Sequence, residues 1–350
     1  MSTWPGVIEQ YRNLIDLPSG APVVTLLEGN TPLIPAPRLT EEIGAASILI
    51  KFEGLNPTGS FKDRGMAVAI SEALYRGANA VICASTGNTA ASAAAYAARS
   101  GLKCFVVIPA GKVAAGKLAG ALAYGAETIL INGSFDDALR LVTELSAHKP
   151  LALVNSINAY RLQGQKTAAF EICDSLGNSP DWLTLPVGNA GNITSYWMGF
   201  REYADLKDTG TPRILGVQAS GAAPLVTGST ISDPETIATA IRIGNPARGE
   251  QAKLAVQQSN GMIVAVSDEE ILAAQRQLSG EGLWVEPASA ASVAGLRSLA
   301  RRGDFDFRGQ TIVCVCTGHG LKDPEIITDH YHPDPPIPAR LSDLERRIEY

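Results

Sequence analysis

Short apolar runs alternate with longer helical patterns along almost the whole of this 350-residue chain. Most of the runs are continuously apolar, which is typical of strands buried on both faces of a parallel sheet. We expect strands at Ser47–Phe52, Ala80–Ala84, Lys103–Ile108, Glu127–Ile131, Leu151–Val154, Trp182–Val187, Arg213–Gln218, Met262–Val266 and Thr311–Cys316. We expect helices at Lys62–Arg76, Asn88–Arg99, Lys112–Tyr124, Phe135–Ala147, Arg161–Leu176, Ile193–Leu206, Asp268–Leu278 and Ala288–Arg302. This repetition predicts an α/β fold with a parallel, doubly wound sheet and sites at the carboxyl ends of its strands.

The charge, the cysteines and the histidines exclude several classes of protein. The formal net charge is −6 and the basic residues are scattered, so we expect no nucleic-acid partner. The uncharged run Ala78–Ala98 contains polar residues, and the N-terminus lacks a basic region, so we expect neither a membrane span nor a signal peptide. The five cysteines are odd in number and lie mostly in apolar runs, which indicates reduced thiols in a cytoplasmic protein. The four histidines show no metal-ligand spacing.

A lysine lies where the strand Ser47–Phe52 gives way to the next helical pattern. The segment Pro57–Gly65 places Lys62 behind a turn that contains proline and glycine. Such junctions carry sites in α/β folds, and an amine held there can form a Schiff base with an aldehyde cofactor. Taken alone, Lys62 also fits an exposed lysine in the first turn of a helix.

Two further segments open helices directly after strands and offer seats for anions. Ser85–Thr89 combines hydroxyl groups with helix N–H groups and suits a carboxylate or phosphate, although a simple N-cap is the alternative. Gly188–Asn192 contains two glycines that let several N–H groups converge on one anion. It lacks the three-glycine dinucleotide spacing, so a cofactor phosphate is the expected ligand, and a tight loop without a ligand is the alternative.

The last two segments follow strands in the same way. Asn155–Arg161 offers two amides, a hydroxyl group and a guanidinium, which together suit a substrate phosphate. Taken alone, it also fits a polar loop with a solvated arginine. Thr317–Asp323 ends the last expected strand and presents a hydroxyl group that could meet a ring nitrogen. His319 in that segment has no nucleophile or carboxylate partner in the sequence pattern, which favours a structural role.

Together these segments resemble the short subfamily of threonine synthases, within the fold-type II pyridoxal-phosphate (PLP) enzymes. The matching segments follow the family order over nearly the whole chain: Glu28–Leu33, Asn56–Arg64, Ser85–Thr89, Asn155–Lys166, Gly188–Asn192, Glu286–Ala291 and Thr317–Asp323. The stretches Asn155–Lys166 and Thr317–Asp323 are the most specific to threonine synthases. The resemblance implies two doubly wound open-sheet domains, similar to the tryptophan synthase β subunit, with the active site in the cleft between them. A large PLP-binding domain would comprise residues 1–58 and 155–350, and a smaller mobile domain residues 59–154.

The resemblance also implies a role for each candidate residue. Lys62 would be catalytic and would bind PLP covalently, Asn88 would bind the ring hydroxyl and Thr317 would face the ring nitrogen. The cofactor phosphate would be held by Gly188, Asn189, Ala190, Gly191 and Asn192. The substrate carboxylate would be bound by Ser85, Thr86 and Thr89, and its distal phosphate by Asn155, Ser156 and Arg161.

The implied reaction converts O-phospho-L-homoserine and water to L-threonine and phosphate, in a cytoplasmic homodimer without a metal ion. A serine/threonine dehydratase of the same fold is the main alternative. Arg161, with Asn155 and Ser156, argues against it, because a dehydratase substrate has no distal anion. A catalytically silent binding protein is a second alternative, against which Lys62 and the intact set of loops argue.

Overall fold

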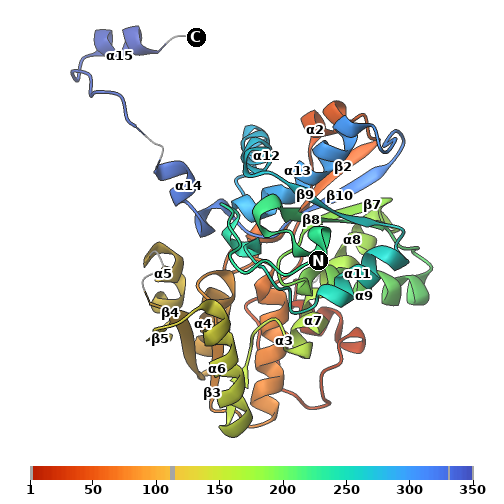
Figure 1. Ribbon diagram of the computed structural model, residues 1–350, viewed down its shortest axis with the longest axis vertical. Coiled ribbons are helices and arrows are strands. Elements are labelled where there is room, and N and C mark those ends of the chain that lie inside the picture. Colours follow the sequence, from red (N-terminus) through yellow and green to blue (C-terminus); the bar gives the residue numbers. More distant parts are fainter. Residues whose placement is uncertain (1–2, 111–114, 330–331, 349–350) are drawn as a thin grey trace.

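The computed structural model describes residues 3–110, 115–329 and 332–348. Their strands form two separate sheets, one of six strands and one of four. Figure 1 shows the four-stranded sheet with its helices in the lower half and the six-stranded sheet in the upper half. The prediction of an α/β fold with parallel sheets is confirmed.

The larger sheet has the strand order β1-β2-β10-β7-β8-β9. All neighbours are parallel except β1 and β2, which are antiparallel. The central strand β7 is buried along its whole length, as its continuously apolar sequence predicts. The bounds are β1 (Leu33–Pro35), β2 (Ser47–Phe52), β7 (Trp182–Pro186), β8 (Arg213–Ala219), β9 (Met262–Val266) and β10 (Thr311–Cys316).

The smaller sheet is entirely parallel and has the order β5-β4-β3-β6. Its bounds are β3 (Ala80–Ala84), β4 (Lys103–Pro109), β5 (Glu127–Ile131) and β6 (Leu151–Leu153). Strand β3 is fully buried, whereas β5 lies at the edge and is largely exposed. All four strands come from one continuous stretch of the chain, between two parts that build the larger sheet.

Helices cover both sheets. The bounds are α1 (Val7–Gln10), α2 (Pro37–Ile43), α3 (Lys62–Tyr75), α4 (Asn88–Ser100), α5 (Ala115–Ala123), α6 (Phe135–His148), α7 (Ala159–Gln165), α8 (Thr167–Leu176), α9 (Gly191–Lys207), α10 (Pro224–Thr227), α11 (Gly249–Gln258), α12 (Asp268–Gly280), α13 (Pro287–Arg302), α14 (Glu325–Thr328) and α15 (Leu341–Arg347). Helix α13 packs against β7, β8, β9 and β10. Its small residues allow this close approach: a Cβ atom on Gly295 would overlap the side chain of Val217.

Most expected elements are confirmed, and the differences have local causes. The three-residue strand β1 was not predicted, because it is too short to show a period. The expected helix Lys112–Tyr124 begins outside the described residues, and its described part forms α5. The expected helix Arg161–Leu176 is two helices, α7 and α8, separated at Lys166. At this break the Thr167 hydroxyl group donates to the Gly164 carbonyl at 2.7 Å, which competes with the backbone ladder.

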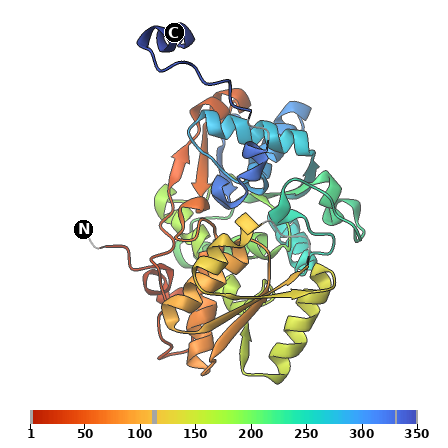
Figure 2. The ribbon, with the colours of Figure 1, turned by 90° about the vertical axis from the view of Figure 1, so that its left-hand side faces the viewer.

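The two sheets share a continuous hydrophobic core. One cluster of buried residues joins α3, α4 and β3 to α8, α9 and β7, and a second surrounds α13 and β8. The C-terminal helix α15 stands clear of both sheets in the two views (Figures 1 and 2). Among the described helices, none combines the length and the apolar character needed to cross a membrane.

Candidate active site

The candidate residues lie where strands end and helices begin, on the side where the two sheets face each other. Lys62 is the first residue of α3, and Asn88 opens α4 directly after β3. Thr317 follows β10, and its carbonyl oxygen accepts a hydrogen bond from the Phe61 N–H at 3.0 Å. Ser60 and Gly318 form an isolated antiparallel bridge beside this bond. The Lys62 turn and the Thr317 loop therefore form one unit, although they are distant in sequence.

Lys62 lies in an environment that favours a neutral amine. Its Nζ lies 3.9 Å from the centre of the Phe61 ring. Burial, together with the positive charge of Arg161, lowers the pKa of Lys62 to about 7, although the Glu286 carboxylate opposes the shift. An amine with this pKa is substantially deprotonated near neutrality, and so it is able to act as a nucleophile or a base.

Arg161 is brought beside Lys62 by a close crossing of α3 and α7. A Cβ atom on Gly65 would lie 2.6 Å from the Arg161 carbonyl oxygen, so the crossing depends on glycine. Arg161 itself is 1% exposed, lies inside α7 rather than in a loop, and donates from Nη1 to the Val154 carbonyl at 3.2 Å. Its buried Nε has no hydrogen-bond partner among the described residues. Burial lowers the pKa of Arg161 to about 10, so it remains cationic at neutral pH.

A buried carboxylate links the two halves of the site. Glu286, at the start of α13, accepts hydrogen bonds from Asn88 Nδ2 at 3.2 and 3.0 Å. Its Oε1 also lies 3.3 Å from the donating Thr317 hydroxyl group. The Thr317 Oγ1 is 2.9 Å from Ser289 Oγ, which in turn accepts from the Gly318 N–H at 2.8 Å. Burial raises the pKa of Glu286, while Asn88 and Lys62 oppose that shift.

The segment Gly188–Asn192 forms the start of the 17-residue helix α9. Ala190 has a left-handed backbone with φ 63°, and it begins the helix without a side-chain cap. Among the described residues, no backbone hydrogen bond uses the N–H groups of Gly191, Asn192 or Ile193. The side-chain oxygen of Asn192 is buried and has no partner in the same part of the chain. Free N–H groups at a helix start, beside an unsatisfied buried amide, suit a phosphate group.

The candidate residues for substrate binding differ in their hydrogen bonds and in their exposure. The Ser85 hydroxyl group accepts from the N–H groups of Gly87 and Ala90 at 3.3 and 3.2 Å, so it caps the start of α4. Thr86 and Thr89 are partly exposed at the same helix start. Asn155 exchanges two hydrogen bonds with the backbone of Ala84, at 3.0 and 2.9 Å, and so joins β6 to β3. This pairing makes Asn155 a structural link at the site.

His319 is held by aromatic neighbours. Its ring stacks on Phe52 with centroids 6.0 Å apart, and the edge contact with Trp284 is at 5.7 Å. Its Nδ1 accepts from the Leu321 N–H at 3.1 Å. These contacts support a structural role for His319.

Behind Lys62 lies a buried ionic cluster that sequence reasoning did not identify. Arg64 donates to Glu53 at 2.7 Å and to Glu171 at 2.6 Å, and Lys51 donates to Glu171 at 2.7 Å. Glu171 also accepts from the Asn30 N–H at 2.8 Å. Burial alone would raise the pKa of Glu171, but Arg64 and Lys51 hold it at about 2. The cluster ties α3 to α8, β2 and the N-terminal segment, and thereby fixes the position of the helix that starts at Lys62.

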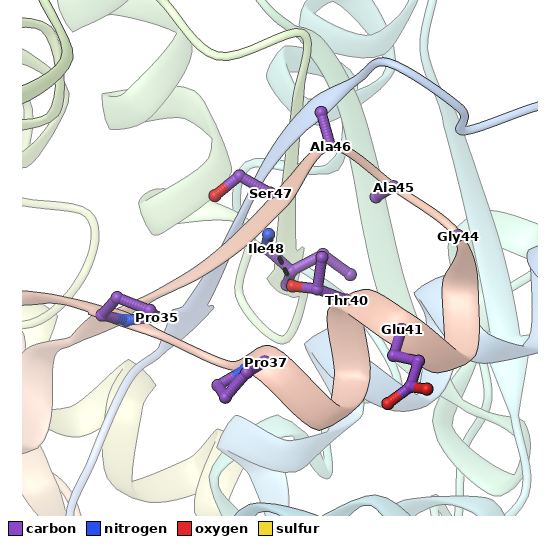
Figure 3. Close-up of a pocket in the computed structure, with 9 residues that line it drawn as sticks. All are labelled: Pro35, Pro37, Thr40, Glu41, Gly44, Ala45, Ala46, Ser47 and Ile48. Atoms are coloured by element: carbon purple, nitrogen blue, oxygen red, sulfur yellow. Dashed lines mark hydrogen bonds between the residues drawn. The ribbon is translucent and has the colours of Figure 1, made fainter.

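Sequence reasoning also gave no role to Glu286, Ser289 or Arg248. Glu286 precedes Pro287 at a helix start, a pattern that indicates the helix but not the partner of the carboxylate. No sequence pattern around Arg248 indicates a role for it. A separate surface hollow between α2 and β2, lined by residues such as Thr40 and Ile48, contains none of the candidate residues (Figure 3). The candidate residues thus lie apart from that hollow.

Comparison with known proteins gives the class of this protein. The model of the family "Pyridoxal-phosphate dependent enzyme" matches residues 24–318, and the chain belongs to this family. The fungal L-serine ammonia-lyase from Rhizomucor miehei superposes with a TM-score of 0.73 at 24% identity, covering 86% of this chain and 97% of that one. This structural similarity confirms the fold-type II architecture.

The sequence relatives are more specific. The chain is 60% identical over 325 residues to a threonine synthase from Synechocystis, covering 92% of this chain and 84% of the relative. It is 57% identical over 339 residues to a threonine synthase from Mycobacterium leprae, covering 96% and 94%. These relatives confirm the resemblance to threonine synthases and do not favour the dehydratase alternative.

The described residues fit PLP. Lys62 offers an amine of lowered pKa, and the start of α9 offers unpaired N–H groups beside the unsatisfied Asn192 amide. The described residues contain no cluster of three or more His, Cys, Asp or Glu side chains that could hold a metal ion. The cofactor assignment thus has a chemical basis in this chain as well as a family basis.

Proposed function

We propose that this chain is a threonine synthase that converts O-phospho-L-homoserine and water to L-threonine and phosphate. The observation that supports this proposal most directly is the buried Arg161, whose positive charge acts on Lys62, because a buried cation near the reacting amine suits a substrate with a distal anion. The proposal is supported by the identity with the Synechocystis and Mycobacterium relatives.

In this proposal each residue has a defined task. Lys62 would hold PLP, Asn88 would bind the ring hydroxyl, Thr317 would face the ring nitrogen, and the start of α9 would hold the cofactor phosphate. When bound, PLP supplies an electron sink for the charge that develops at the substrate Cα. The Lys62 amine, neutral near pH 7, would take a proton from Cα and later one from Cβ.

The substrate would be held at both ends. Ser85, Thr86 and Thr89 at the start of α4 would seat its carboxylate. Arg161 and Ser156 would bind the phosphate that leaves Cγ, with Asn155 holding the segment in place through Ala84. A hydroxyl group from water would then be added at Cβ. Fixing both ends orients the reacting carbon atoms relative to the Lys62 amine.

We also propose the arrangement of the whole enzyme. The segment 59–154, which contains all strands of the smaller sheet, would move as a domain against residues 1–58 and 155–350. The protein would be a cytoplasmic homodimer. Its five cysteines are buried and unpaired, which is compatible with a reducing compartment. Light scattering after size exclusion tests the dimer, because a monomeric mass would contradict it.

The decisive experiment measures phosphate release from O-phospho-L-homoserine and identifies the amino-acid product. We expect stoichiometric phosphate and L-threonine. Formation of a keto acid and ammonia from serine or threonine, without turnover of the phosphorylated substrate, would instead identify a dehydratase.

A further inference from the structure

The turn between β6 and α7, residues 154–157, has all of its carbonyl groups occupied. The Val154 carbonyl accepts from Arg161 at 3.2 Å, and the Asn155 carbonyl accepts from the Asn158 N–H at 3.0 Å. The Ser156 carbonyl accepts from Arg248 Nε at 3.2 Å, and the Ile157 carbonyl accepts from Arg248 Nη2 at 2.9 Å. Two guanidinium groups therefore bind three of the four carbonyl groups.

Three of the four N–H groups of the same turn are free, whereas the Val154 N–H donates to the Ile82 carbonyl at 3.1 Å. Within the part of the chain that the structure describes, no hydrogen bond uses the N–H groups of Asn155, Ser156 or Ile157. A turn in which guanidinium groups bind three carbonyl groups and three N–H groups are free is oriented to receive an anion. Its orientation depends on Arg248, which supplies two of the four carbonyl contacts.

The charges point to the same ligand. Among the described ion pairs, none includes Arg161 or Arg248, so neither guanidinium is in direct contact with a carboxylate, although the Asp63 charge acts on Arg161. A phosphate monoester carries a charge of about −1.5 to −2 at pH 7 and therefore matches two such cations. Arg161 binds the turn from α7, and Arg248 binds it from the connection between β8 and β9.

Arg248 also reaches the proposed cofactor-phosphate segment. Its backbone N–H donates to the Asn189 carbonyl at 3.3 Å, and the Ala247 N–H donates to the Asn189 side-chain oxygen at 3.4 Å. One residue of the larger-sheet unit thus connects the segment at the start of α9 with the turn that follows β6 of the smaller sheet. Loss of its side chain would free the Ser156 and Ile157 carbonyl groups to turn toward the anion.

We propose that Arg248 is a positioning residue for the phosphate of the substrate, holding the 154–157 turn so that its N–H groups face that phosphate. This inference rests on the proposed function and adds a residue to it. Arg248 acts through the turn, and its guanidinium is not itself assigned to the reacting atoms.

The test titrates inorganic phosphate into the PLP-loaded enzyme and measures binding by calorimetry. L-threonine, which lacks a phosphate, serves as the comparison ligand. We expect Arg248→Ala to weaken phosphate binding and to raise the KM for O-phospho-L-homoserine, each roughly tenfold, with a smaller change in kcat. L-threonine binding should be unchanged. Arg248→Lys, which keeps the charge but not the two-point contact, should fall between Ala and the unmodified protein.

The matched control is Arg242→Ala. Arg242 lies in the same connection between β8 and β9, but it is exposed and forms an ion pair with Glu235 at 3.9 Å. It should leave all three measurements unchanged. Unaltered phosphate affinity in Arg248→Ala, or equal weakening of phosphate and L-threonine, would overturn the positioning role. Should Arg248→Ala not fold, the same two titrations on Arg248→Lys decide the question. If the unmodified enzyme does not turn over the phosphorylated substrate, the proposed function fails, and the phosphate titration still tests Arg248.

Discussion

The Glu286 carboxylate and the Asn88 amide face each other across the two halves of the site, with Nδ2–Oε distances of 3.2 and 3.0 Å. Asn88 follows a strand of the smaller sheet, whereas Glu286 opens a helix packed on the larger one. This contact ties the two units together at the point where the cofactor ring is proposed to bind. The same carboxylate opposes the lowering of the Lys62 pKa, so it also acts on the reacting amine.

Replacing Lys62 with Ala should abolish turnover and the visible absorbance of the bound cofactor, because no amine remains for covalent attachment. Mass spectrometry after borohydride reduction measures the result directly. Lys253→Ala, a change at an exposed lysine paired with Glu250, should retain the adduct. A trapped adduct on the Lys62→Ala protein would mean that another amine holds PLP.

The rate of PLP attachment to the cofactor-free protein should rise with pH around a midpoint near 7. Only the neutral amine is nucleophilic, and the pKa of Lys62 is lowered to about 7. Glu286→Gln should move this midpoint to lower pH, because it removes the charge that stabilises the protonated amine. Arg161→Met should move it to higher pH, since it removes the repelling cation. Stopped-flow absorbance measures both, and a midpoint near the usual value of about 10.4 would contradict the assigned environment.

Arg161→Met should weaken binding of O-phospho-L-homoserine by about 1.5–3 kcal/mol, the range for hydrogen bonds to charged groups. Methionine fills much of the same buried space, so the effect should come mainly from the lost charge. Steady-state kinetics on the phosphorylated substrate provide the measurement. Unchanged KM and kcat would remove Arg161 from the phosphate site.

Glu171→Gln should reduce the free energy of unfolding by about 3–5 kcal/mol, because it leaves Arg64 and Lys51 buried without their shared carboxylate. Urea unfolding at neutral pH measures the loss. Glu250→Gln breaks an exposed pair with Lys253 and should have little effect. Equal midpoints for the two variants would show that the cluster does not stabilise the fold.

The lowered pKa of Glu171 also predicts that the free energy of unfolding depends on pH in the acid range. The folded-state pKa of Glu171 is about 2, below its ordinary value of 4.5, so its contribution is complete above about pH 4.5. That contribution is lost as the pH falls from 4.5 through 2. Unfolding measured across this window should show a steeper decline for the unmodified protein than for Glu171→Gln.

Local sequence determined most of the secondary structure and the positions of the candidate residues along it. The bounds of β2, β3, β5, β9 and β10 coincide with the apolar runs expected for them. For β3 and β10 the reason is burial on both faces, which demands a continuous apolar sequence. Lys62, Asn88 and Thr317 could be placed at strand ends and helix starts for the same reason.

Tertiary structure alone decided which of these junctions meet. Three contacts join residues that are distant in sequence: the Asn155–Ala84 pairing, the Glu286–Asn88 contact and the hydrogen bonds of Arg248 to the 154–157 turn. No periodic pattern encodes such partners, because they depend on how the two sheets pack and on the close crossing of α3 and α7 at Gly65 and Gly164.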